Sequence, residues 1–347
     1  MANSKNNKIK LVIGLLISAL FLYLAFRKVD FGEMLHTFKK ANYWYFIPVV
    51  LIMFLSHFLR ALRWRYLLDP IRRLDIGSLF SSLIIGYAAN TFMPAHLGEF
   101  LRAYVLGKKR QIPMSPVFAT IVVERIIDVF SLLFLTLLAL FIYPFPDWVI
   151  NSAYIMLAGS VFLLIVLIFL KKASLSTMRI VGVILTPFPD AFEEKIKAML
   201  ERFIQGILPL ARWHDYITVS ILSLIIWLCY GLIFYFCLNA FDFVDPYNLE
   251  WSASLILLVI TTIAVVVPSS PGYVGTYHYL CQITLALFGV PAGPALSFAV
   301  VVHGINFLPV LVVGLFLAQY EGMAILKMSK DVSEIEKKEG FERSGGD

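Results

Sequence analysis

The sequence predicts an all-α polytopic membrane protein, with about six spanning helices plus two re-entrant hairpins of broken helices arranged in inverted repeats. Apolar residues make up 60% of the 347 residues and charged residues only 15%, whereas apolar usage in soluble domains is nearer to half. Several apolar runs approach the ~20 residues that a helix needs to cross a bilayer. Two further apolar regions are broken by Pro and Gly at one spacing, Pro94 with Gly98 and Pro268 with Gly272.

Six apolar runs with few charges are the expected spanning helices. The first follows a cluster of lysines and resembles the apolar part of a signal peptide. No cleavage site of small residues follows it, so we expect this run to be retained as a helix. The six runs are Leu11–Phe26, Trp44–Leu59, Pro116–Tyr143, Trp148–Leu170, Tyr216–Phe241 and Pro294–Ala318.

The two broken regions are the expected hairpins. The first runs from Gly77 to Gly107, and its second arm, about ten residues at ~1.5 Å each, is too short to cross ~30 Å of hydrocarbon. The second runs from Trp251 to Val290 and has longer arms. Two full spans therefore remain an alternative to a hairpin there, and both would give the same topology.

The distribution of Lys and Arg predicts the orientation. With both broken regions read as hairpins, most of the 29 Lys and Arg residues fall on one side, including those from Arg60 to Arg73 in a loop. The positive-inside rule makes that side cytoplasmic, so we expect a multi-pass protein of the cell membrane with both termini in the cytoplasm. Membrane topology and anionic lipid headgroups account for the net charge of +6, so no nucleic-acid partner is expected.

The second half is expected to repeat the first in the opposite orientation. Residues 44–143 and 216–318 each comprise a helix, a hairpin and a helix, and the run at 148–170 is the odd crossing that inverts the second copy. Apolar residues at helical spacing between Phe192 and Ile207 predict an amphipathic cytoplasmic helix between the halves. We expect residues 1–326 to form one transmembrane domain and the charged residues 327–347 a disordered cytoplasmic tail.

Charged residues within the apolar runs are candidates for a substrate site. A charge at the centre of a bilayer costs ~2.5–3.5 kcal/mol, so such a side chain usually faces a partner or a cavity. Glu124, Arg125 and Asp128 share one broad helix face. They predict either an ion pair that neutralises itself or a polar wall along a substrate route, with Arg125 paired to Glu124, Asp128 or Glu99.

The breaks themselves are candidates for binding an anion. A broken helix exposes backbone N–H groups at its new N-terminus, and these attract a phosphate together with the helix dipole. Simple kinks at Pro and Gly are the alternative. The candidate substrate-binding residues are Asn90, His96, Gly98, Glu99, Arg102, Glu124, Arg125, Asp128, Ser269, Ser270, Gly272, Gly275, Thr276, His303 and Asn306.

Known catalytic motifs are missing from the sequence. It has no P-loop, no His-Glu-x-x-His, no Gly-x-Ser-x-Gly and no paired Cys motif, so we expect no enzyme activity, catalytic residue, metal or cofactor. The three cysteines lie in apolar stretches without metal-ligand spacing and are expected to be core residues. His57 and His214 stand alone and are expected to be structural or interfacial.

Four segments carry a resemblance to a known family: NTFMPAHLGEFLRAYVLGKK, VVERIIDVF, PSSPGYVGTYHY and HGINFLPVLVVG. They resemble the flippase-like transmembrane domain of lysylphosphatidylglycerol synthases and its standalone relatives. The resemblance implies movement of a lipid between leaflets. Full-length bacterial members add a soluble domain that aminoacylates phosphatidylglycerol, and this chain is expected to be a standalone member without it.

Three functions follow from these observations and stay open. The first is a flippase for an anionic or phosphate-bearing (glyco)phospholipid, and the second is an ion-coupled small-solute transporter. The third is a non-transporting partner of a membrane glycosyltransferase, because other relatives are linked with polyprenyl-phosphate sugar pathways. The expected partners are a membrane phospholipid or a polyprenyl-phosphate lipid, with a second copy of the chain, a glycosyltransferase or a lipid-modifying enzyme as candidate protein partners.

Overall fold

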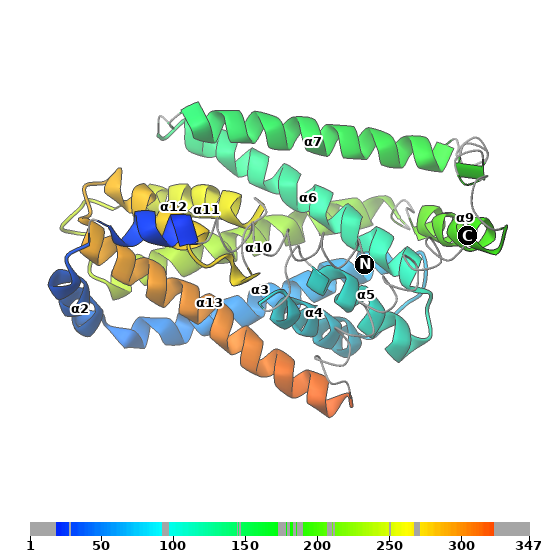
Figure 1. Ribbon diagram of the computed structural model, residues 1–347, viewed down its shortest axis with the longest axis horizontal. Coiled ribbons are helices and arrows are strands. Elements are labelled where there is room, and N and C mark those ends of the chain that lie inside the picture. Colours follow the sequence, from blue (N-terminus) through cyan, green and yellow to red (C-terminus); the bar gives the residue numbers. More distant parts are fainter. Residues whose placement is uncertain are drawn as a thin grey trace, which may run out of the picture.

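The computed structural model describes residues 19–322 with gaps, and these residues form helices joined by short loops without a β-strand (Figure 1). The residues inside that range that are not described are 28, 92–96, 144, 146, 173–177, 179–180, 183–184, 186–189, 207–209, 211, 250 and 267–270. The predicted all-α class is confirmed. The tail expected at 327–347 lies outside the described residues, as does most of the first apolar run, of which residues 19–26 are helical.

Five long helices correspond to the other five predicted runs: α3 (Phe46–Leu68), α6 (Met114–Leu140), α7 (Asp147–Lys172), α10 (Trp213–Ala240) and α13 (Ala292–Tyr320). Four of them, all but α6, are long and apolar enough to cross a membrane. Helix α6 has 27 residues, which is about 40 Å at ~1.5 Å per residue, but it carries three charged side chains. The protein is a multi-pass membrane protein.

Helix α3 corrects the predicted boundary at Leu59. It continues to Leu68, because no Gly or Pro interrupts the sequence before Pro70. Arg60 and Arg63 therefore lie inside a helix and are buried, whereas the predicted boundary placed them in the segment after it. Carboxylates on a neighbouring helix neutralise them, which allows the helix to continue through both arginines.

Each broken region forms two short helices that pack against each other. The first consists of α4 (Ile76–Asn90) and α5 (Leu97–Arg110), and the second of α11 (Trp251–Val266), the 3₁₀ turn η2 (Pro271–Tyr273) and α12 (Thr276–Ala286). Glycines let α4 and α5 approach closely, because a Cβ added at Gly98 would overlap the carbonyl oxygen of Gly86. The prolines at both breaks, Pro94 and Pro268, lie outside the described residues.

The two breaks come together in the middle of the bundle. A Cβ added at Gly272 would lie 3.6 Å from the carbonyl oxygen of Thr91, the residue that ends α4. Helix α13 packs along α4 and α12, and α10 packs along α3. The long helices thus surround the point where the hairpins meet.

Two helices lie at the edge of this bundle. Helix α7 stands apart and packs mainly against α6, with most of its apolar side chains exposed, as expected for a helix in contact with lipid (Figure 1). Helix α9 (Asp190–Gly206) packs against the start of α6 and confirms the predicted helix between the halves. Ile207, its predicted last residue, is not described.

A further helix, α2 (Phe31–Lys40), was not expected from the sequence. Its N-cap is Asp30, whose carboxylate accepts the N–H groups of Gly32 and Glu33. Only one side of this short helix packs, against the start of α13. Its sequence therefore contains no long apolar run that would have predicted it.

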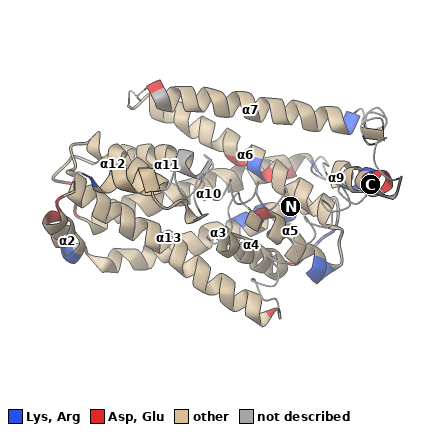
Figure 2. Ribbon diagram, in the orientation of Figure 1, with Lys and Arg blue, Asp and Glu red and all other residues tan. Residues whose placement is uncertain are grey.

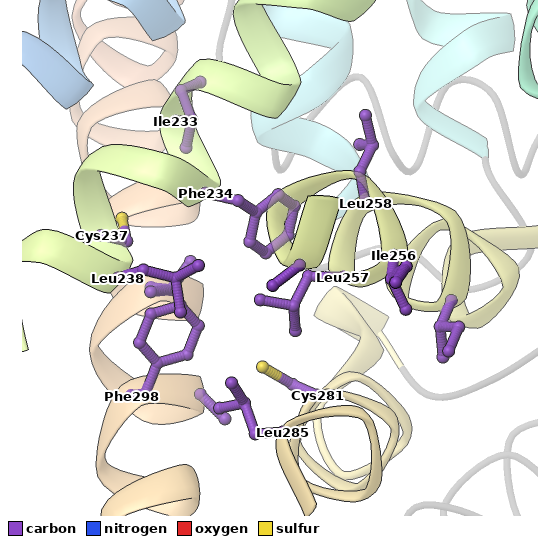
Figure 3. Close-up of a cluster of buried hydrophobic side chains, with 14 of the residues drawn as sticks. Ile233, Phe234, Cys237, Leu238, Ile256, Leu257, Leu258, Cys281, Leu285 and Phe298 are labelled. Atoms are coloured by element: carbon purple, nitrogen blue, oxygen red, sulfur yellow. The ribbon is translucent and has the colours of Figure 1, made fainter. Parts of the chain in front are cut away.

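The largest apolar core lies where α10, α11, α12 and α13 meet (Figure 3). Cys237, Cys281, Leu257 and Phe298 point into it together. All three cysteines are free and buried, which confirms that they are core residues. This core fixes α12, and therefore the end of the second break, against α11 and α13.

Candidate functional site

Seven charged side chains form a network inside the bundle, which we call the ion-pair network. Figure 2 shows that the charged positions of α6 lie in the interior, whereas those of α7 lie at its two ends. Helices α3, α5 and α6 supply the members: Arg60, Arg63, Glu99, Arg102, Glu124, Arg125 and Asp128.

Glu124 is fully buried and lies among three arginines. It accepts hydrogen bonds from Arg102 at 2.8 Å and from Arg60 at 3.1 Å, and Nη2 of Arg63 lies 3.5 Å away. The guanidinium of Arg102 also stacks on the ring of Trp64, 3.6 Å from its centroid. Such a buried charge is tolerable only because each carboxylate oxygen meets a cation.

Asp128, four residues after Glu124 on α6, contacts two of the same arginines. It accepts hydrogen bonds from Arg60 and from Arg63, the latter at 2.6 Å, and Nη1 of Arg125 lies 3.5 Å away. Arg60 also donates to the hydroxyl of Tyr230 at 2.8 Å, which ties the network to α10.

Arg125 is the most exposed arginine of the network, with 34% of its side chain accessible. Its Nε lies 2.6 Å from Glu99. The prediction that Arg125 pairs with Glu124, Asp128 or Glu99 is therefore confirmed, with Glu99 and Asp128 as the partners. Four arginines face three carboxylates in the network, which leaves one positive charge uncompensated among the described residues. Arg125 has Glu99 as a partner, whereas Arg60, Arg63 and Arg102 share Glu124 and Asp128, so the excess belongs to the network as a whole. Arg125 forms the exposed side of the network.

Two cavities lie against this exposed side. The first, of about 310 Å³, extends between α6, α10 and α11, and the second, of about 490 Å³, extends between α3, α4 and α13. They share one wall, made of Arg60, Arg125, Val129, Tyr230, Tyr273, Asn306 and Phe307. An anion could therefore contact the same two arginines from either cavity.

An apolar groove adjoins the first cavity. It lies between α6 and α10, has a volume of about 440 Å³, and is lined mainly by apolar side chains such as Phe130, Phe134 and Leu224. Trp227 lines both the groove and the first cavity. The cavity that contains Arg60 and Arg125 and the apolar groove are thus in contact.

Five of the predicted binding residues line the cavities: Asn90, Glu99, Arg125, Asp128 and Asn306. Arg102 and Glu124 do not line them, because they lie behind the wall and pair with each other. The N–H of Gly98 donates to the side chain of Asn90 at 2.8 Å. It is not a free donor for a phosphate, contrary to the role expected for a helix break.

The predicted residues of the second break hold the backbone rather than face the cavities. The N–H of Gly275 donates to His278, and the carbonyl of Gly272 accepts from His303. The side chain of Thr276 is buried, and its hydroxyl has no hydrogen-bond partner among the described residues. His96, Ser269 and Ser270 lie outside the described residues.

Sequence reasoning missed several residues of the site. Arg60 and Arg63 are three residues apart on an apolar helix. The apolar residues that continue after them to Leu68 could have shown that the helix extends past both arginines. Tyr230 and Tyr273 gave no signal, because tyrosines are common in membrane helices. His57, expected to be structural or interfacial, lines the second cavity and lies with its ring 5.2 Å from that of Tyr87.

Comparisons with known proteins agree with this architecture. A protein of Methanothermobacter thermautotrophicus described as a UPF0104 membrane protein is 24% identical over 343 residues, covering 93% of this chain and 98% of its own length. UPF0104 membrane protein MJ1595 of Methanocaldococcus jannaschii is 23% identical over 351 residues, covering 95% and 98%. Glycosyltransferase AglD of Haloferax volcanii is 25% identical over 327 residues, covering 86% of this chain but only 52% of its own length.

No solved structure matches the chain. The model of one protein family, described as the lysylphosphatidylglycerol synthase TM region, matches residues 11–314. That match includes the two broken regions, the ion-pair network and both cavities. The chain therefore belongs to the family of the lysylphosphatidylglycerol synthase TM region.

Proposed function

We propose that this protein moves a lipid with an anionic or phosphate-bearing headgroup between the two leaflets. The observation that carries the proposal is the shared wall of the two cavities, where Arg60 and Arg125 stand as members of a network with four arginines and three carboxylates. A phosphate in hydrocarbon would lose its hydration at a prohibitive cost. Two guanidinium groups inside the bundle would replace that hydration.

The donors in this proposal differ from the backbone amides that a helix break suggests. Guanidinium groups bind phosphate through two parallel hydrogen bonds, which makes arginine well suited to this task. Glu99 and Asp128 would fix the orientation of Arg125 while leaving part of it open to the cavity. Tyr230 would do the same for Arg60.

The apolar groove favours a lipid over a small solute. A headgroup in the first cavity would lie beside Trp227, from which the groove between α6 and α10 leads on. Hydrocarbon chains could remain in that groove and in the bilayer while the headgroup crosses. A transporter for a small polar solute has no use for such a groove.

Reconstituted liposomes test the proposal. We expect the purified protein to transfer a fluorescent phosphatidylglycerol between leaflets faster than empty liposomes do. Replacing a charged donor to the phosphate should cost ~1.5–3 kcal/mol, so Arg125→Gln should slow the transfer by about tenfold or more. Arg65→Ala is the matched control, because Arg65 lies on α3 near Arg60 but outside the network.

Each variant is first checked for correct folding by gel filtration and thermal unfolding, because a misfolded variant would also lose transfer. Wild-type transfer by a folded Arg125→Gln variant would remove this arginine from the mechanism. Equal rates in empty and protein-containing liposomes, for phosphatidylglycerol and for a polyprenyl-phosphate probe, would contradict the flippase role itself.

A second function is favoured by one comparison. The relative named glycosyltransferase AglD matches this chain over about half of its own length. This chain could serve a separate glycosyltransferase as the membrane partner that presents a polyprenyl-phosphate lipid. Under this alternative the chain would bind a polyprenyl phosphate without transferring it, and adding it to a glycosyltransferase reaction would raise the rate.

A further inference from the structure

Two histidines hold the backbone of the second break. His303, on α13, lies with its Nε2 2.7 Å from the carbonyl oxygen of Gly272. A carbonyl oxygen only accepts, so this nitrogen carries a hydrogen and donates it. His278, in the first turn of α12, accepts the N–H of Gly275 on its Nδ1 at 3.2 Å. That nitrogen therefore carries no hydrogen, and the ring of His278 is neutral.

The backbone between these anchors has an uncommon conformation. Gly272, Tyr273 and Gly275 have φ angles of 68°, 57° and 90°. For a tyrosine such an angle costs ~1–3 kcal/mol, and it persists only where the surroundings hold it. Tyr273 belongs to the wall shared by both cavities. The two histidines thus hold the segment that places Tyr273 between the cavities.

The two imidazole rings also contact each other, with centroids 4.7 Å apart. Helices α11, α12 and α13 carry no Asp, Glu, Lys or Arg, so none of them offers a charge to balance a proton on this pair. Tyr277 faces both rings, and Arg125 and Glu99 lie beyond Tyr273 in the ion-pair network. The charged residues of α2 pack near Gly293, about three helical turns from His303.

We propose that His278 and His303 form a proton-binding site that releases the backbone of residues 272–275 when it is occupied. A proton on Nδ1 of His278 removes the acceptor of the Gly275 N–H. It also puts a positive charge in the first turn of α12, where the helix dipole opposes it. A proton on the other ring adds repulsion between two neighbouring cations. The strained segment then relaxes, and Tyr273 leaves the wall between the cavities.

A proton is therefore a second ligand of this protein, and its site is separate from the arginines that would hold a headgroup. Imidazole is the side chain that ordinarily changes its charge nearest to neutral pH, which makes a pair of histidines a suitable place for a proton to bind. This inference does not require the proposed lipid, because it concerns the backbone of residues 272–275 alone.

Hydrogen–deuterium exchange of the purified protein tests the inference without any substrate. Peptides that cover residues 271–280 are compared at pH ~4 and ~7.5 after correction for intrinsic exchange, because a buried imidazole without a neighbouring counter-charge takes up a proton only well below the ordinary pKa of ~6.5. We expect the wild-type amides of this segment to exchange several-fold faster at the lower pH. His278→Asn should remove the difference and keep the protection, because its side-chain oxygen can accept the Gly275 N–H but cannot take up a proton.

Two further variants complete the experiment. His303→Gln keeps a donor for the Gly272 carbonyl and should also reduce the pH response, whereas His36→Asn, at an exposed position of α2, should leave it unchanged. Equal corrected exchange at both pH values in the wild type would overturn the inference, even if a variant failed to fold. A folded His278→Asn protein with the wild-type response would overturn it as well.

Discussion

At the scale of single residues, burial separates the charged side chains that hold the fold from those that face a cavity. Glu124 and Arg102 are almost fully buried and contact only protein groups, whereas Arg125 keeps a third of its side chain open to the cavities. A buried ion pair is costly to break because the remaining charge has no water. We therefore expect Glu124 and Arg102 to affect stability, and Arg125 to affect transport.

Removing Glu124 tests this division. Glu124→Ala leaves three arginines without their shared partner and should destabilise the protein by ~3–5 kcal/mol. The double variant Glu124→Ala, Arg102→Met should be less destabilised than the sum of the two single changes, with a coupling of ~0.5–3 kcal/mol. Thermal unfolding in detergent measures both. Glu201→Ala on α9, at an exposed position, should change stability by less than ~0.5 kcal/mol, and strict additivity of the first pair would argue against coupling.

At the scale of elements, glycine decides whether the first broken region can pack as a hairpin. Gly98 contacts the backbone of Gly86 and the side chain of Asn90 so closely that no Cβ fits. Gly159 on α7 has nothing within 4 Å of where a Cβ would stand. The same substitution should therefore have opposite effects at the two positions.

Gly98→Ala should destabilise the protein by ~1–3 kcal/mol, because the backbones of α4 and α5 must separate to admit the new methyl group. Gly159→Ala should be neutral or stabilising by up to ~1 kcal/mol, since alanine favours a helix. The unfolding temperatures of the two variants give the comparison directly. A Gly98→Ala protein as stable as the wild type would contradict the close packing of α4 against α5.

At the scale of the whole molecule, the packing partners of the two halves correspond. Helix α3 packs on α10, the hairpin helix α4 packs on α13, and the hairpin helix α11 packs on α6. Two units related by a two-fold axis would make these same pairings, which supports the inverted repeat of residues 44–143 and 216–318. The repeat and the cytoplasmic termini remain predictions.

Cysteine labelling in sealed membranes tests the topology. Helix α6 lies between Arg110 and Asp147, so we expect single cysteines at these two positions to react with impermeant reagents from opposite sides. Position 110, after a cluster of basic residues, should be cytoplasmic. The native cysteines are buried, which keeps the background low. Reaction of both positions from the same side would show that α6 does not cross and would end the inverted-repeat model.

The sequence by itself determined the class of this protein, its long helices and the positions of both breaks, because hydrophobic length and Pro or Gly interruptions act within a few residues. Only the tertiary structure decided which charges meet. Arg60 and Asp128 are far apart in the chain, and their contact depends on how α3 packs against α6. The two histidines of the second break, the shared cavity wall and the excess positive charge of the ion-pair network likewise arise from the packing of separate helices. No local pattern encodes these contacts, since each requires two helices to pack in one particular register.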